Sequence, residues 1–251
     1  MDQNVKISRM ARRPLIAATV AMTAATTLAV TAQPAQASTH RPCTIVKHST
    51  TNGVTKLGTA TATVGADGIK LTTAQNTNVD KVTWRETIRP IPANTLNELT
   101  YETVKLDQTA GDNNVVNDAA LPSYHIYVKT PAGEGTLVYE PYWYLSQNGL
   151  GTPQRQVRTE WNVLQGKLWT SSNVITGLPP MGGGPPAKTF AEIVAANPKM
   201  VVTGYGFGLG TYNAGTIAVL DEQRFATKTS CSEHQWSTGF RNNVWWPGWL
   251  R

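Results

Sequence analysis

Clustered aromatic rings are the first side chains capable of chemistry that stand out in this 251-residue chain. Tyr139, Tyr142, Trp143 and Tyr144 lie close together, at the end of an expected strand over 136–144. Exposed tyrosine and tryptophan rings bind the flat C–H faces of sugars, while a few polar groups fix the orientation of the ligand. We expect Tyr142 and Tyr144 on the strand face opposite Trp143, with at least one of the two rings exposed.

Four further tryptophans belong to the same candidate ligand-binding set. Trp161 and Trp169 fall on the next expected hairpin, and Trp245 and Trp246 lie near the C-terminal end of the sequence. In a β-sandwich such rings also fill the core, so the alternative for each ring is a purely structural role.

Carboxylates are the second source of chemistry, since cleavage of a glycosidic bond needs two of them roughly 5–9 Å apart. Glu86, Glu140 and Glu160 each stand alone on an expected strand, and no expected strand carries two acidic residues at positions i and i+2. Asp221 and Glu222 are adjacent, so they point to opposite faces. Catalysis would therefore require carboxylates to converge across strands, and the sequence favours a protein that is not an enzyme.

Metal and cofactor chemistry has little support in the sequence. His48, His125 and His234 lack the spacing of metal ligands, so we expect them to be solvated or structural. The oxygen-rich stretch 112–118 is typical of polar turns, although calcium binds the same side-chain types. Motifs for nucleotide binding and for serine-dependent or metal-dependent hydrolysis are missing. We expect no cofactor, with a structural calcium ion as the alternative.

The first 37 residues have the three parts of a secretory signal peptide. Basic residues come first, an apolar run over 15–30 follows, and Ala35-Gln36-Ala37 matches an Ala-x-Ala cleavage site. The run is too short and too rich in alanine and threonine for a stable membrane span, so a retained anchor is the less favoured alternative. We expect a secreted, extracellular protein without a transmembrane segment after cleavage.

Loss of this segment changes the meaning of the formal net charge of +6. Four of the 22 basic residues and one of the 16 acidic residues lie in it, so the remaining chain is nearly balanced. No run rich in lysine and arginine follows. The electrostatic footprint of a nucleic-acid-binding protein is therefore missing.

Cys43 and Cys231, the two cysteines, lie near the two ends of the expected mature chain. In an oxidising compartment a disulfide between them is the natural assignment, with two unpaired buried thiols as the alternative. Such a bridge closes a loop of nearly the whole domain, which the chain-entropy model values at about 4–5 kcal/mol. It also requires the first and last strands to be neighbours.

Residues 38–230 are predicted to form one all-β domain, a jelly-roll-like antiparallel sandwich with one short helix. Short runs of strand-forming residues alternate with glycine, proline and asparagine turn signals. A capping box of Thr189 and Glu192 begins the helix, and Asn197-Pro198 ends it. The expected strands are 44–48, 56–64, 68–73, 81–89, 99–107, 123–130, 136–144, 157–163, 167–171, 200–209 and 216–226.

One expected strand has side chains on a single face. A period of two places Thr203, Tyr205, Phe207 and Leu209 on one face and four glycines on the other. The large side chains belong to the core. The glycine face lets a backbone, a packed loop or a ligand approach closely.

The C-terminal segment 231–251 is rich in aromatic residues. It holds four of the eight tryptophans of the chain, which is too many for a disordered tail. We expect it to dock on the sandwich and cover an edge strand. The alternative is a projecting aromatic strip that binds a cell wall or an anionic membrane.

A resemblance to known proteins rests on four stretches, namely 135–141, 166–169, 189–198 and 210–225. Their order is similar to that in a jelly-roll β-sandwich family of secreted actinobacterial proteins, which broadly resembles carbohydrate-binding modules. The resemblance implies a sandwich over about residues 55–228. It also implies that Asp221, in the last strand, would help to hold a structural calcium ion.

Together these observations predict a secreted, non-catalytic module that binds a polysaccharide or cell-wall glycan. A polysaccharide-cleaving enzyme with cross-strand carboxylates and a purely structural or interaction domain are the alternatives. The sequence leaves the oligomeric state open. The rings expected to bind the ligand are those of Tyr142, Tyr144, Trp161, Trp169, Trp245 and Trp246.

Overall fold

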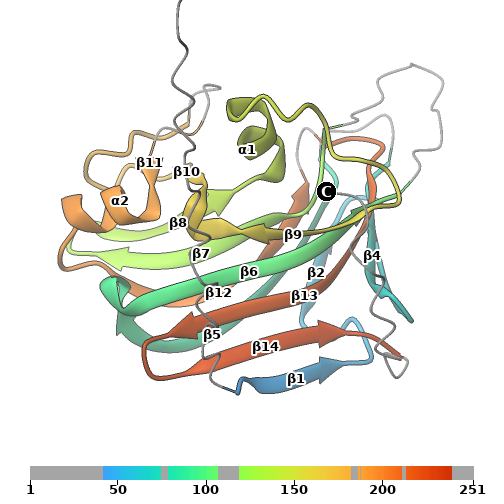
Figure 1. Cartoon of the computed structure of the whole chain (residues 1–251), viewed down its shortest axis with the longest axis horizontal. Coiled ribbons are helices and arrows are strands. Elements are labelled where there is room, and N and C mark those ends of the chain that lie inside the picture. The colour runs from blue at the N-terminus through green and yellow to red at the C-terminus, as the bar shows by residue number, and fades with distance from the viewer. Residues whose placement is uncertain are drawn as a thin grey trace, which may run out of the picture. The chain divides into compact units, whose positions relative to one another are not determined.

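Two seven-stranded β-sheets enclose one hydrophobic core in the computed structural model (Figure 1). The structure describes residues 42–74, 79–106, 119–181, 186, 188–210 and 213–238. The all-β sandwich expected from the sequence is confirmed. The expected signal peptide and the pair Trp245 and Trp246 lie outside the described residues.

The first sheet consists of β1 (Thr44–His48), β3 (Thr61–Gly65), β4 (Gly68–Thr72), β6 (Leu96–Lys105), β9 (Arg158–Asn162), β13 (Ile217–Thr227) and β14 (Cys231–Trp236). Strand β13 is its centre, with β6 and then β9 on one side. On the other side, the first part of β13 pairs with β4 and its second part pairs with β14. The strands β3 and β1 complete the two branches.

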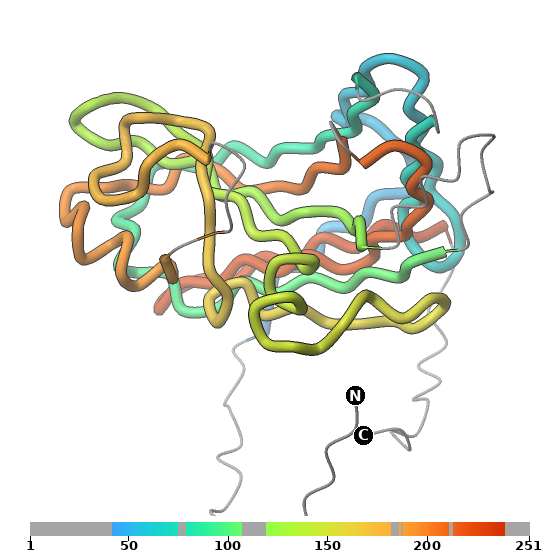
Figure 2. Tube along the Cα trace, turned by 90° about the horizontal axis from the view of Figure 1, so that it is seen from above, coloured from blue at the N-terminus to red at the C-terminus, as the bar shows by residue number. Residues whose placement is uncertain are grey.

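The second sheet has the order β11 (Lys188–Thr189), β10 (Lys167–Thr170), β8 (Gly133–Tyr139), β7 (Ser123–Thr130), β12 (Val201–Gly210), β5 (Lys81–Pro92) and β2 (Val54–Leu57). Two α-helices accompany the sheets, α1 (Pro141–Gln147) and α2 (Phe190–Ala196). Two short 3-10 helices, Ala93–Thr95 and Val163–Gln165, follow β5 and β9. Figure 1 shows β1 and β14 at one side of the molecule and both α-helices at the opposite side. In Figure 2 the yellow-green coil of α1 lies to one side of the long strands.

The expected strand 56–64 is wrong as a single element, because it divides into β2 and β3. Gly58 lies at the break with a φ of +71°, a conformation that favours glycine. The neighbouring Thr59 donates its backbone N–H and its hydroxyl to the buried carboxylate of Asp80, at 2.8 and 2.9 Å. These bonds hold the turn against the start of β5.

The expected strand 136–144 is also wrong in its second half. Strand β8 ends at Tyr139, and α1 begins at Pro141. Proline suits the first helical position because its fixed φ is already helical. The backbone N–H that proline lacks would have no intrahelical partner at this position. Pro141 and Leu145 are buried and attach the helix to the core. By contrast, α2 has the predicted capping box of Thr189 and Glu192.

The one-sided pattern of β12 is confirmed over 204–210, but a bulge between Val202 and Gly204 takes Thr203, which was expected on the core face, out of the alternation. Tyr205, Phe207 and Leu209 are buried in the core. On the opposite face, a side chain at Gly206 would overlap the backbone oxygen of Trp84 in the neighbouring β5. The glycine face therefore serves the close approach of another backbone.

Contacts across the core join β12 to β13 of the other sheet. The ring of Tyr205 stacks on Phe225 with centroids 4.3 Å apart. The buried side chain of Gln223 donates from its Nε2 to the backbone oxygen of Gly206 at 2.6 Å. A buried polar bond in this position helps to align the two sheets.

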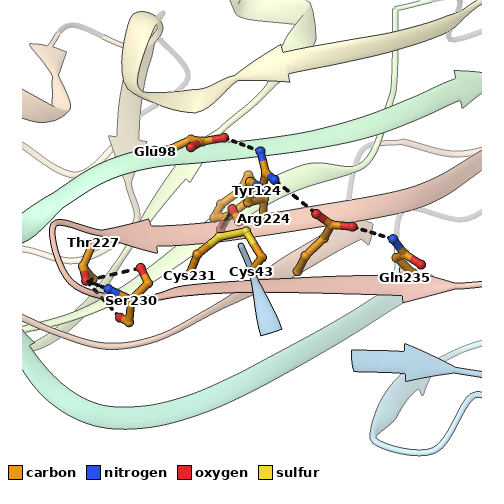
Figure 3. Close-up of a disulfide and its surroundings, with 9 residues drawn as sticks. Cys43, Glu98, Tyr124, Arg224, Thr227, Ser230, Cys231 and Gln235 are labelled. Carbon is orange, nitrogen blue, oxygen red and sulfur yellow. Dashed lines mark hydrogen bonds and ion pairs between the residues drawn. A yellow bond between two sulfur atoms is a disulfide. The ribbon is translucent and has the colours of Figure 1, made fainter. Parts of the chain in front are cut away.

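The predicted disulfide between Cys43 and Cys231 is present (Figure 3). Beyond it, β1 pairs with β14 in parallel, from Thr44 opposite Ser232 to His48 opposite Trp236. The first and last described strands are therefore neighbours, as the bridge requires. Part of the C-terminal aromatic segment belongs to the sheet itself.

A chain of hydrogen bonds connects this corner to the second sheet. His48 Nε2 lies 2.8 Å from His234 Nδ1, and His234 Nε2 lies 2.7 Å from the hydroxyl of Tyr205. Burial lowers the pKa of both histidines, and that of His234 falls to about 4. The rings are neutral at pH 7, and Trp236 stacks on His48 with centroids 4.8 Å apart. These histidines are structural.

We predict that Gly206→Ala lowers the free energy of unfolding by about 1–3 kcal/mol, because the added methyl group meets backbone rather than a movable side chain. Urea unfolding of the purified protein measures the change. The matched control is Gly65→Ala, where the nearest atom, the backbone oxygen of Gly68, lies 3.8 Å away. Equal changes in the two variants would contradict the role assigned to the glycine face.

Candidate functional site

A cavity of about 800 Å³ lies over the face of the second sheet that points away from the core. Side chains of β5, β7, β8 and β10 line it, together with the glycine-rich backbone of β12, α1 and residues 119–121. This volume is in the range of small-molecule and oligosaccharide sites.

Backbone register arranges the floor of the cavity in three rows that cross the strands. Cross-strand neighbours on one face lie about 5 Å apart, so the members of a row are in contact range. Continuing the observed pairing by one residue at the strand ends adds Glu140 and Ser171. The rows are Glu140, Ser123, Gly208 and Thr83; then Trp169, Val138, His125, Gly206 and Arg85; then Ser171, Thr136, Tyr127 and Gly204.

The glycines of β12 leave the middle of this floor without side chains. The ring of His125 uses the space over Gly208, where an added Cβ would lie 2.5 Å from the His125 Cε1 atom. Beside it, Tyr127 carries the guanidinium of Arg85 at 4.1 Å from its ring centroid. The same glycines that admit a neighbouring backbone therefore also make room for the cavity.

A hydrogen-bonded pair, Ser123 and His125, forms the polar part of the floor. The Ser123 hydroxyl donates to the backbone oxygen of Gly208 at 2.8 Å and lies 2.9 Å from His125 Nε2. Because its one proton is used on the carbonyl, Nε2 carries the ring proton and donates to the serine. Burial and the nearby charge of Lys81 lower the pKa of His125 to about 4. The ring is neutral at pH 7 and keeps Nδ1 as an acceptor.

Glu140 lies at the end of the first row, next to Ser123 by register, between β8 and α1. Burial raises the pKa of its carboxyl group to about 7, while the nearby side chains of Trp143 and Trp169 favour the ionised form. The buried indole Nε1 of Trp169 has no hydrogen-bond partner among the described residues. The carboxylate and the two indoles thus form one group, supplied by three different elements. Near neutral pH this carboxyl group changes its charge readily.

Helix α1 decides which aromatic residues reach the cavity. Tyr142 is 38% exposed, and its ring centroid lies 4.9 Å from that of Trp143. Both residues line the cavity. Tyr144 does not line the large cavity. Its ring centroid lies 6.2 Å from that of Tyr139 and 6.4 Å from that of Trp161. The expected pairing of Tyr142 with Tyr144 on one strand face is therefore wrong, because the segment is a helix.

The two tryptophans of the expected hairpin have different surroundings. Trp169 lines the cavity beside Val138. Trp161 is only 5% exposed, and its indole N–H donates to the hydroxyl of Thr103 at 2.7 Å. Trp161 is thus mainly a core residue. It borders a second, smaller hollow of about 390 Å³ that also includes Tyr144.

Asp221, the candidate calcium ligand, is buried and contacts a cation of the protein itself. Its carboxylate accepts a hydrogen bond from Arg158 at 2.7 Å, and Arg158 also contacts Glu102 at 3.0 Å. Among the described residues, no group of three or more acidic, histidine or cysteine side chains is placed to hold a metal ion. The guanidinium group supplies the positive charge here.

The three glutamates considered for catalysis do not share a cavity. Glu140 is the single described carboxylate that lines the large cavity, and Glu160 borders the smaller hollow. Glu86, on β5, pairs with Tyr205 of the neighbouring strand β12. Glu160 does pair directly with Glu102 across β9 and β6. That pair lies outside the large cavity.

Sequence reasoning missed the polar part of the floor. Ser123, His125 and Tyr127 alternate along β7, and this alternation was the available signal that they share a face. Their proximity to Glu140 had no local signal, because it arises from the pairing of β7 with β8. The position of Trp143 was also missed, because the segment expected to be a strand is the helix α1.

Comparison with known sequences leaves the chain without an assigned family, since no protein-family model and no curated protein matches it. The resemblance to jelly-roll proteins is supported at the level of the β-sandwich. Within the part of the chain that the structure describes, every helix is too short or too polar to cross a lipid bilayer.

We predict that Glu140→Gln reduces the loss of stability between pH 5 and pH 8. The folded protein holds the Glu140 proton more tightly than the unfolded chain, so stability present below the ordinary pKa is lost as pH rises through about 7. The variant should gain about 1–3 kcal/mol relative to the wild type at pH 8, and less at pH 5.

Urea unfolding across this pH range measures the effect. Glu134→Gln, at an exposed carboxylate on the preceding strand β8, is the control and should follow the wild type. The histidines contribute equally to all three proteins, so the difference between variants isolates Glu140. A parallel pH profile for Glu140→Gln and Glu134→Gln would refute the assignment.

Proposed function

We propose that the protein is a secreted, non-catalytic module that binds a sugar-containing ligand in the large cavity. The observation that carries this proposal is the combination of rings and polar groups around one hollow. Tyr142, Trp143 and Trp169 offer apolar surfaces, while Ser123 and Thr136 offer hydroxyl groups on the floor. Sugars need both kinds of contact, since each sugar ring has C–H faces and a rim of hydroxyl groups.

The cavity supports binding better than hydrolysis. A hydrolase of the common type needs two carboxylates on opposite sides of the scissile bond, and Glu140 is the single described carboxylate among the lining residues. The Ser123–His125 pair does not replace them, because the histidine donates to the serine and cannot take its proton in this tautomer. A polymer or cell-wall glycan is the ligand class that these groups suit.

We predict that Trp143→Ala and Trp169→Ala each weaken oligosaccharide binding at least about tenfold, which corresponds to about 1.4 kcal/mol. Isothermal titration calorimetry with oligomers of glucose, glucosamine, N-acetylglucosamine and xylose measures the affinity. Leu57→Ala, at an exposed apolar residue on β2 outside the cavity, is the control and should bind like the wild type.

Failure of the folded wild type to bind any of these oligomers at millimolar concentration would refute the proposed function. Binding that survives both tryptophan substitutions would show that the ligand uses another surface. Circular dichroism and urea unfolding establish that each variant is folded.

Export is the second part of the proposal. Its support is the signal-like sequence of residues 1–37 together with the disulfide, which forms and persists in oxidising compartments. We predict that protein recovered from the culture medium begins at Ser38 and contains the bonded pair Cys43 and Cys231. N-terminal sequencing and mass spectrometry without reductant check both points. An uncleaved protein retained by the cells would contradict export.

A further inference from the structure

The carboxylate of Glu140 lies in the cavity without a cationic partner among the residues that the structure describes. Burial is the main influence on it, and the two indoles of Trp143 and Trp169 are its polar neighbours. A buried carboxylate is costly unless a positive charge compensates it. At this position the fold supplies donors but no such charge.

The lysines near the cavity do not meet this need. Lys81 lines the cavity from β5, three strands away from β8, which places its backbone roughly 14 Å from that of Glu140 at the usual strand spacing. Lys167 lies next to Glu140 by register, yet it is exposed, does not line the cavity and acts on Glu192 instead. Arg85 lies at the far end of the middle row, also three strands from β8, with its guanidinium over the ring of Tyr127. His125 is neutral at pH 7.

Aromatic surfaces complete a site for a small organic cation. Trp143, Trp169 and Tyr142 line the same part of the cavity as the carboxylate. The faces of indole and phenol rings attract an ammonium group, more strongly when water is excluded. A carboxylate combined with such rings favours a ligand ammonium over a neutral amide of the same shape.

We propose that the ligand of this cavity is an amino sugar with a free ammonium group, a de-N-acetylated hexosamine unit, and that Glu140 is its counter-charge. This inference rests on the proposed sugar-binding function and names its ligand class. Ser123 lies next to Glu140 in the same row of the floor and Thr136 lies in the third row, and both would face hydroxyl groups of the bound sugar. No bond is made or broken in the bound state.

The test is calorimetric titration of the full mature protein at pH 7 with two tetrasaccharides that differ in one group. One is the β-1,4-linked glucosamine tetramer, and the other is its fully N-acetylated form. The wild type should bind the glucosamine tetramer at least about tenfold more tightly. Glu140→Gln should reduce that preference to about twofold or less, whereas the control Lys167→Gln should keep it.

A second measurement needs no variant, so it holds even if Glu140→Gln does not fold. Protonation of Glu140 removes the counter-charge, and lowering the pH from 7 to 5 should therefore reduce the preference of the wild type at least severalfold. The uncharged N-acetylated tetramer reports any general effect of pH on the cavity.

The outcomes separate this inference from the function on which it rests. Equal binding of the two tetramers, or a preference for the N-acetylated form, overturns the amino-sugar assignment while sugar binding stands. A preference that persists in folded Glu140→Gln overturns the role of Glu140. Absence of binding to either tetramer, with binding to a neutral glucan, also refutes the inference, and absence of all binding refutes the proposed function as well.

Discussion

The close approach of backbones at the glycines of β12 is the constraint on which the rest of the structure depends. This strand lies between β7 and β5, and over 204–210 its larger side chains reach into the core while glycines form its other face. On the other face, Gly206 leaves no room between its own backbone and the carbonyl of Trp84. The bond from Gln223 to the Gly206 carbonyl then aligns the second sheet with the first. A side chain at this point would disturb the packing on both faces.

The cavity is the outward consequence of the same constraint. Because β12 contributes no side chains to the floor, the neighbouring strands and α1 determine the chemistry by what they place around it. They place a neutral histidine bonded to a serine there, and next to the serine a carboxylate close to two indoles. Burial of the Glu140 carboxylate without a cation lowers stability, and the proposed cationic ligand would offset this loss. Such a site would lower the stability of the free protein and favour a cationic ligand over a neutral one.

Local signals made much of this fold predictable. The strand 123–130 and the capping box at Thr189 were predicted correctly, because side-chain alternation and capping act between residues close in sequence. The helix α1 was not, since its tyrosines and tryptophan favour strands by propensity. Burial of Pro141 and Leu145 against the core overrides that preference. Likewise, the isolated turn at Gly58 depends on Asp80, which is distant in sequence.

The sequence by itself determined the all-β class, the one-sided strand and the pairing of Cys43 with Cys231, because each follows from side-chain type, period or count. Only the tertiary structure decided which aromatic rings surround the cavity and that Glu140 shares it with Ser123 and His125. The physical reason is that strand register and helix packing bring these groups together, and both depend on contacts between segments far apart in the chain. Asp221 illustrates the same point, since its partner Arg158 comes from another strand.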